Sequence, residues 1–150
     1  MRVIVLVENT SISKDYKSKH GLCLYIETKK HKLLFDLGSN SLFLENAVKL
    51  GVNITDIDSV IISHGHNDHG GALKYFLENN AKANIYISRY AFEEYYANFL
   101  GMKWNVGLDR KLKDHPRIIL IEDEYVIDEE LQIFSNIEEH LYLPTANTSL

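Results

Sequence analysis

The sequence is poor in cysteine and proline. It has one cysteine, Cys23, and two prolines among 150 residues. A single cysteine excludes a disulfide within the chain. Cys23 lies in the apolar run GLCLYI, where we expect a small buried side chain rather than a reactive thiol. With no Gly/Ser-rich linker and no low-complexity segment, we expect one domain over residues 1–150.

Long apolar runs and an excess of positive charge are also missing. No stretch approaches the ~20 apolar residues that a membrane helix needs. The opening run MRVIVLV meets Glu8 and Asn9 too early for a signal peptide, which predicts a cytoplasmic protein without a membrane partner. The formal net charge of −5 argues against a nucleic-acid partner, because contact with phosphates requires a basic surface.

Apolar periodicity predicts an α/β (α+β layered) domain with helices packed on a sheet. We expect strands at 2–8, 21–28, 31–38 and 83–88, one ending at Ser63, and two or three within 117–137. Helical spacing is expected at 39–51, 71–80 and 89–100. Strands 21–28 and 31–38 should form an antiparallel hairpin, and 9–20 should be a long loop, which in a compact domain is often functional.

The stretch SVIISHGHNDHGGAL places three histidines and one aspartate within six residues, directly after an apolar strand. His64 and His66 are two apart and project to one side of an extended segment, so they can share a metal ion. Asp68 and His69 follow where the chain turns, and they can hold a second ion. Imidazole and carboxylate ligands suit zinc, with iron or manganese as alternatives. Two such ions activate a bridging water as hydroxide at neutral pH.

The motif SHGHNDHGG resembles the HxHxDH signature of the metallo-β-lactamase superfamily, and LLFDLG resembles that family's strand ending in Asp-x-Gly. LVENTS, HGLCLYIE and NVGLD are further similar to a branch of the dihydropterin-ribofuranosylaminobenzene-phosphate synthase type. The resemblance implies an αββα sandwich with a two-metal site. His64 and His66 would bind the first ion, Asp68 and His69 the second.

The resemblance also implies roles around the metals. Asp68 would orient the attacking water or accept its proton. Asp36 would support the metal loop without binding an ion. Asn9 and His20 lie near the same edge of the sheet and are candidates for contacts to the ligand residues or to the substrate, although a turn role for Asn9 and a surface position for His20 explain them equally well.

The later ligands of the family have no counterpart after His69. His115 lies in the polar turn KDHPR, and His140 in IEEHLYLP, and neither matches the family's metal loops. We therefore expect an incomplete sandwich, the N-terminal portion of a larger fold, whose exposed sheet face favours a homo-oligomer or a completing chain.

Three functions remain open on this basis. The first is a hydrolase that uses a metal-bound hydroxide on a small ester, phosphoester, lactone or thioester. The second is a non-catalytic or truncated protein that keeps the fold without the full site. The third is lyase or transferase chemistry on a pterin-type phosphate, which rests on the branch resemblance alone.

Overall fold

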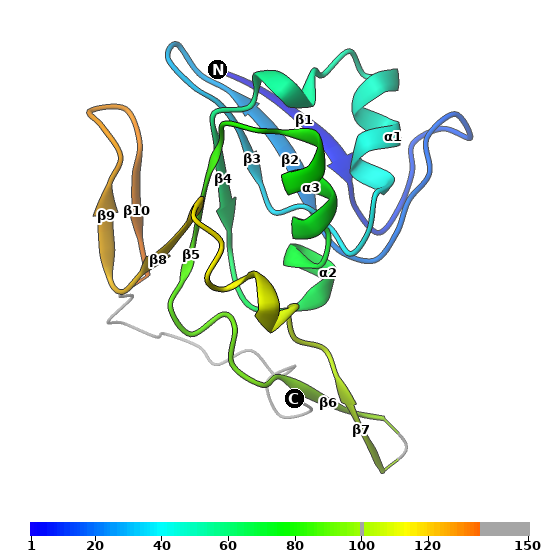
Figure 1. Cartoon of the computed structure of the whole chain (residues 1–150). Helices are drawn as coiled ribbons and strands as arrows, with labels where there is room; N and C mark the ends of the chain where they lie inside the picture. Colours follow the sequence, from blue (N-terminus) through cyan, green and yellow to red (C-terminus); the bar gives the residue numbers. More distant parts are fainter. Residues whose placement is uncertain (100, 136–150) are drawn as a thin grey trace, which may run out of the picture.

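A six-stranded mixed sheet forms the centre of the protein. The computed structural model describes residues 1–99 and 101–135, and within them the strand order is β1-β2-β3-β4-β5-β8 (Figure 1). The strands are β1 Arg2–Val7, β2 Cys23–Glu27, β3 Lys32–Phe35, β4 Ser59–Ile62, β5 Asn84–Ser88 and β8 Ile118–Ile121. β1, β2 and β3 pair antiparallel, whereas β3, β4, β5 and β8 run parallel. The predicted α/β class and the β2–β3 hairpin are confirmed.

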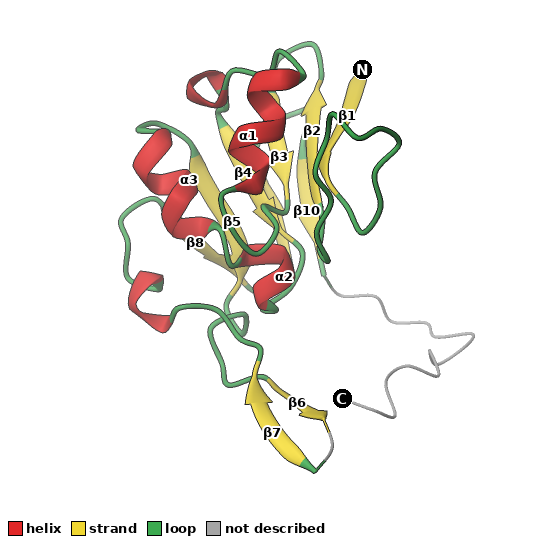
Figure 2. Cartoon of the chain, turned by 90° about the vertical axis from the view of Figure 1, so that its right-hand side faces the viewer, coloured by secondary structure: helices red, strands yellow, loops and turns green. Residues whose placement is uncertain are grey.

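The two faces of the sheet are covered differently. The helices lie on one face (Figures 1 and 2): α1 Leu42–Lys49, α2 Asn67–Gly70 and α3 Leu73–Asn79. The hairpin of β9 Glu124–Val126 and β10 Gln132–Phe134 lies on the other side, and its Tyr125 ring contacts Tyr86 at 5.3 Å. Two 3-10 turns, Ile54–Asp56 and Arg110–Leu112, complete the described elements beside the hairpin discussed below.

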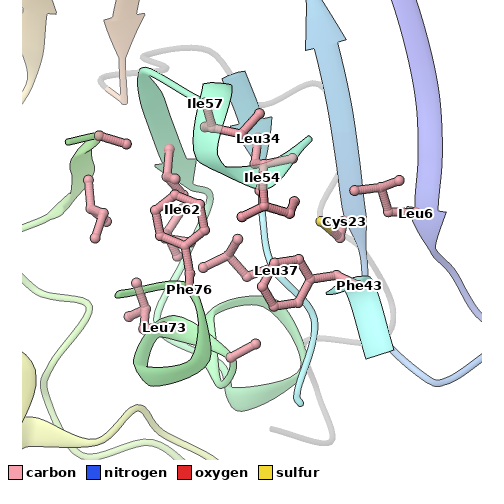
Figure 3. Close-up of a cluster of buried hydrophobic side chains, with 14 of the residues drawn as sticks. Leu6, Cys23, Leu34, Leu37, Phe43, Ile54, Ile57, Ile62, Leu73 and Phe76 are labelled. Atoms are coloured by element: carbon pink, nitrogen blue, oxygen red, sulfur yellow. The ribbon is translucent and has the colours of Figure 1, made fainter. Parts of the chain in front are cut away.

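The core fills the space between the helices and the sheet. Phe43 from α1 and Phe76 from α3 are fully buried and point toward the sheet (Figure 3). They meet Leu34 of β3 and Ile62 of β4. Burial of each such side chain contributes about 1.5–3 kcal/mol, so this layer holds the helices to the strands. Cys23 is also fully buried, as its apolar run predicted.

Parallel pairing brings two loops to one edge of the sheet. α1 connects β3 to β4, and α3 connects β4 to β5. The carboxyl ends of parallel strands therefore lie together, and the segment after β3 emerges beside the segment after β4. Residues 36–38 and 63–69 are neighbours in space for this reason.

The helix predicted at 89–100 is wrong. After β5 the chain turns, and β6 Tyr96–Phe99 pairs with β7 Met102–Asn105 in an antiparallel hairpin. The turn includes Gly101 at φ +78°, a conformation that favours glycine. Among residues 89–98, Ala91 and Phe92 are the buried apolar residues. Because two buried positions are too few to hold a helix against the core, aromatic β propensity and this turn outweigh the helical spacing.

The remaining expectations need smaller changes. The helix predicted at 71–80 begins at Leu73 and follows the short α2, which the motif itself forms. Three strands are found within residues 117–135, in agreement with prediction. In the described part of the chain, no helix combines the length and apolar character needed to cross a bilayer.

Candidate metal centre

The histidine motif occupies the loop that leaves β4. The chain leaves the sheet after Ile62, bends at His64 and Gly65, is extended at His66, and then winds into α2. The backbone N–H groups of His69 and Gly70 both donate to the His66 carbonyl, which closes the turn. This winding places Asp68 and His69 back over His64.

Three side chains of the motif converge. One ligand atom from each of His64, Asp68 and His69 lies within 4.8 Å of the others. The His64 and His69 rings are 4.3 Å apart between centroids, and His69 Nε2 is 3.4 Å from Asp68 Oδ2. All three side chains are half-buried. Two imidazoles and a carboxylate at this separation are a ligand set that suits zinc.

His66 occupies a neighbouring position. Its ring stacks edge-on against His64 at 4.6 Å and against Tyr95 at 5.4 Å. It is not part of the three-residue set. The set thus draws one residue from the first predicted ligand pair and two from the second, and the predicted division of the four residues between two ions stays a prediction.

Asp36 ties the metal loop to the neighbouring strand. Its side chain is fully buried, and its Oδ2 lies 2.7 Å from Nδ1 of His69. It also accepts hydrogen bonds from the Ser63 backbone N–H and from the Ser63 hydroxyl, both at 2.8 Å. A carboxylate on one ring nitrogen of a histidine sets the tautomer and leaves the other nitrogen free as a ligand. Asp36 therefore directs His69 Nε2 toward the set.

The backbone holds Asp36 in this position. Its φ of 58° is in the left-handed region, which Asp tolerates better than most residues. Its N–H donates to the Ile61 carbonyl at 2.8 Å, and the next N–H, that of Leu37, donates to the His69 carbonyl at 2.8 Å. The loops after β3 and β4 are thus joined through both backbone and side chains.

The surroundings of His64 favour its neutral imidazole. Burial lowers the pKa of His64, and the nearby His69 and His66 lower it further. The Ser63 hydroxyl is 2.9 Å from His64 Nδ1. An imidazole must be unprotonated to bind a metal, so this shift keeps His64 ready to act as a ligand.

Asn9 and His20 lie at the rim of the centre. His20 Nε2 is 3.3 Å from Asp68 Oδ2, although the His20 side chain is 81% exposed. Asn9 accepts a hydrogen bond from the Gly21 N–H at 3.1 Å. Both residues, with Glu8, Asp68 and His69, line a hollow of about 210 Å³ beside the set. His20 thus contacts one predicted metal ligand, Asp68. Whether Asn9 or His20 contacts a substrate stays a prediction.

Gly21 is a residue whose role the sequence reasoning missed. It has φ +124°, and a Cβ atom there would lie 2.0 Å from the carbonyl oxygen of Asp68. The start of β2 can therefore approach the motif only without a side chain. The position of Gly21 before the apolar run LCLYIE gave little indication of this role, because a glycine there is also typical of an ordinary strand boundary.

Gly65 lies between the first two histidines at a point of close packing. A Cβ at Gly65 would lie 2.3 Å from the Ala91 carbonyl and 2.6 Å from the Tyr95 ring. The segment after β5 thus packs directly on the motif. Tyr95 is half-buried there, whereas Tyr86 is buried and Tyr96 is exposed.

Of the later histidines, His115 is not part of the set. His115 Nδ1 accepts a hydrogen bond from the Arg117 N–H in the turn before β8. His140 lies outside the described residues. The side chains described here fit a zinc ion through His64, Asp68 and His69, with Asp36 supporting His69 from behind.

Comparisons with known proteins give the family. The family model described as the metallo-beta-lactamase superfamily matches residues 19–146. An uncharacterized protein of Methanocaldococcus jannaschii is 32% identical over 132 residues, covering 85% of this chain and 50% of that protein. The chain thus spans about half the length of the curated relative it matches.

Solved structures agree with the fold. A metal-dependent hydrolase of the beta-lactamase superfamily aligns with TM-score 0.69 and 26% identity, over 88% of this chain and 46% of that one. A quorum-quenching N-acyl homoserine lactone lactonase has the same fold, with TM-score 0.54 and 19% identity over 75% of this chain and 48% of that one. Motif, fold and family match together show that the chain belongs to the metallo-beta-lactamase superfamily.

Proposed function

We propose that the protein is a metal-dependent hydrolase that cleaves a small ester, lactone, thioester or phosphoester. The observation that carries this proposal is the convergence of His64, Asp68 and His69 within 4.8 Å at the end of β4. A bound zinc ion would supply Lewis acidity, lowering the pKa of a water and polarising the bond under attack.

The chain's own residues would divide the remaining work. His64 and His69 would hold the metal, and Asp36 keeps His69 in the tautomer that leaves Nε2 free. Asp68 would hold the metal through one carboxylate oxygen, which leaves the other oxygen able to accept the proton of the attacking water beside the adjoining hollow. His20, 3.3 Å from Asp68, can pass that proton to solvent.

A metal assay tests the proposal. We expect zinc to co-purify with the chain and to raise its free energy of unfolding, by about 2.7 kcal/mol at a free zinc concentration 100 times Kd. The double variant His64→Ala/His69→Ala should lose both effects, and His115→Ala is the matched control. Zinc retained by the double variant would contradict the assignment.

A non-catalytic role is the second candidate, and a specific observation favours it. The described residues supply one set of three ligand atoms, fewer than the two-ion site expected from the motif needs. Catalytic zinc sites need ligands fixed around an open position. Zinc binding without turnover of 4-nitrophenyl acetate or bis(4-nitrophenyl) phosphate would support this candidate over the first.

We also propose that the 150-residue chain self-associates through the apolar side chains that β1 and β2 present on the face opposite the helices. Val3 and Val5 lie on the edge strand β1 and are 50% and 49% exposed. They pair with Ile26 and Leu24 of β2, so the four side chains share one face, opposite the helices. Light scattering should show a dimer of wild type and a monomer of Val5→Lys; a wild-type monomer would refute the proposal.

A further inference from the structure

An apolar hollow of about 450 Å³ lies beside the edge strand β1. Its walls come from β1, β2, the loop 9–20 and the end of α1, and they include Ile4, Leu6, Leu22, Leu24 and Leu50. This volume is in the range of sites that bind small molecules, which are mostly apolar with a few polar groups.

The loop wall of the hollow is anchored to the rest of the domain. The Asn46 side-chain amide donates to the carbonyls of Leu6 at 2.7 Å and Lys17 at 3.0 Å, joining α1, β1 and the loop. The Lys17 ammonium pairs with Glu45 at 2.9 Å, and the Lys49 ammonium donates to the Asp15 carbonyl at 2.6 Å. The hollow is therefore formed before any ligand arrives.

The hollow adjoins the metal centre. Glu8 and Leu22 line both it and the smaller hollow that contains His20, Asp68 and His69. These two residues stand between the metal centre and the apolar space, so a molecule that occupies both must pass them. The Glu8 carboxylate at the junction disfavours an anionic group there and favours a neutral one.

We propose that the apolar hollow binds the acyl or aryl group of a neutral ester, lactone or thioester whose reacting carbonyl lies at the metal centre. The inference rests on the proposed function and narrows it, since it sets phosphoesters aside. Apolar burial supplies the binding, and its strength should grow with the length of the buried chain.

The first experiment measures binding without metal, so that it does not depend on catalysis. Octanamide is added to the metal-free chain, and methyl resonances of Leu, Ile and Val are followed by NMR, with acetamide as the short control. We expect octanamide to shift Ile4, Leu24 and Leu50 methyls and acetamide to leave them unchanged. No shift at these positions would overturn the proposal.

Variants then localise the binding. Leu50→Trp should fill the hollow and abolish the octanamide shifts. Val48→Trp is the matched control, because Val48 is 80% exposed on the same helix and does not line the hollow. Leu24→Phe fills the hollow from the opposite wall if Leu50→Trp does not fold. The proposal would be refuted if both filling variants still bind octanamide. It would also be refuted if they lose binding only because their oligomeric state changes.

The second experiment uses the zinc-loaded chain with 4-nitrophenyl esters from acetate to octanoate. We expect kcat/KM to rise about three- to fourfold per added methylene in wild type, and to stay flat in Leu50→Trp. Hydrolysis without dependence on chain length would overturn this inference and leave the hydrolase proposal intact. Octanamide binding without hydrolysis of any ester would overturn the hydrolase proposal and leave the binding inference intact.

Discussion

The Asp36 carboxylate lies 2.7 Å from Nδ1 of His69, and the two residues lie in the segments that follow the parallel neighbours β3 and β4. The contact joins a residue after β3 to a residue 33 positions later in the histidine motif. It decides which nitrogen of His69 is available to a metal, and it is made deep in the domain, where Asp36 is fully buried. The metal centre therefore depends on sheet pairing as much as on the motif.

Asp36→Asn should weaken zinc binding about 10- to 100-fold, the usual effect of losing an outer partner of a histidine ligand. The amide keeps the shape and can still accept from Ser63, but its NH₂ group would favour the opposite His69 tautomer. Competition with a chromophoric chelator measures the affinity. Asp109→Asn, an exposed helix cap where Asn serves equally, is the control. Unchanged affinity would show that Asp36 does not set the tautomer.

His66→Ala should reduce zinc affinity less than His64→Ala or His69→Ala, because the His66 ring lies beside the set and contacts Tyr95. The same chelator competition, applied to the three single variants, gives the order. An equal loss in all three would mean that His66 turns into the set when metal binds, as the motif alone predicts.

Gly21→Ala should destabilise the protein and weaken zinc binding together. The new Cβ would meet the Asp68 carbonyl at 2.0 Å, and φ +124° is strained for alanine, which together cost about 1–3 kcal/mol or more. Gly51→Ala is the matched control, since Gly51 also has positive φ (+70°) but open space around it. Urea denaturation and zinc titration measure the two effects, and equal behaviour of both variants would show that the contact with Asp68 is unimportant.

His31 should make stability depend on pH. Burial acts to lower its pKa, but hydrogen bonds to Asp128 at 2.8 Å and Asp58 at 3.1 Å outweigh burial and raise the pKa. The protonated ring is thus favoured in the folded state. Its stabilisation is complete below the unfolded pKa of about 6.5 and is lost as pH rises through the higher folded value.

Urea denaturation at pH 5.5 and pH 8.5 tests this behaviour. The difference in unfolding free energy between wild type and His31→Gln should be larger at pH 5.5 than at pH 8.5. Asp128→Asn, which removes one partner from the β9–β10 hairpin, should reduce the pH dependence. A difference that grows with pH would have the wrong sign and would refute the assignment.

The positions of the strands along the chain, the β2–β3 hairpin, the helix after β3 and the position of the histidine motif could all be predicted from the sequence. Each depends on local information: β-branched runs, apolar spacing and turn residues act over a few positions. The motif is recognisable because its ligand types and spacing lie in one short segment, HGHNDH. The helix predicted at 89–100 was wrong because it relied on the same local information. The aromatic spacing fits a helix, whereas pairing with β7 makes Tyr96–Phe99 a strand.

Which residues meet was decided by the tertiary structure. Parallel pairing of β3 with β4 brings Asp36 under His69, and the return of the loop 9–20 brings His20 and Gly21 against Asp68. The family resemblance pointed to Asp36 and His20 near the metal loop, but the atoms that meet could not be read from the sequence. The partners are more than 30 residues apart, and their positions follow from burial of the sheet and helices. Residue types and spacing determined the chemistry available to this protein, and long-range packing decided how those residues are arranged to carry it out.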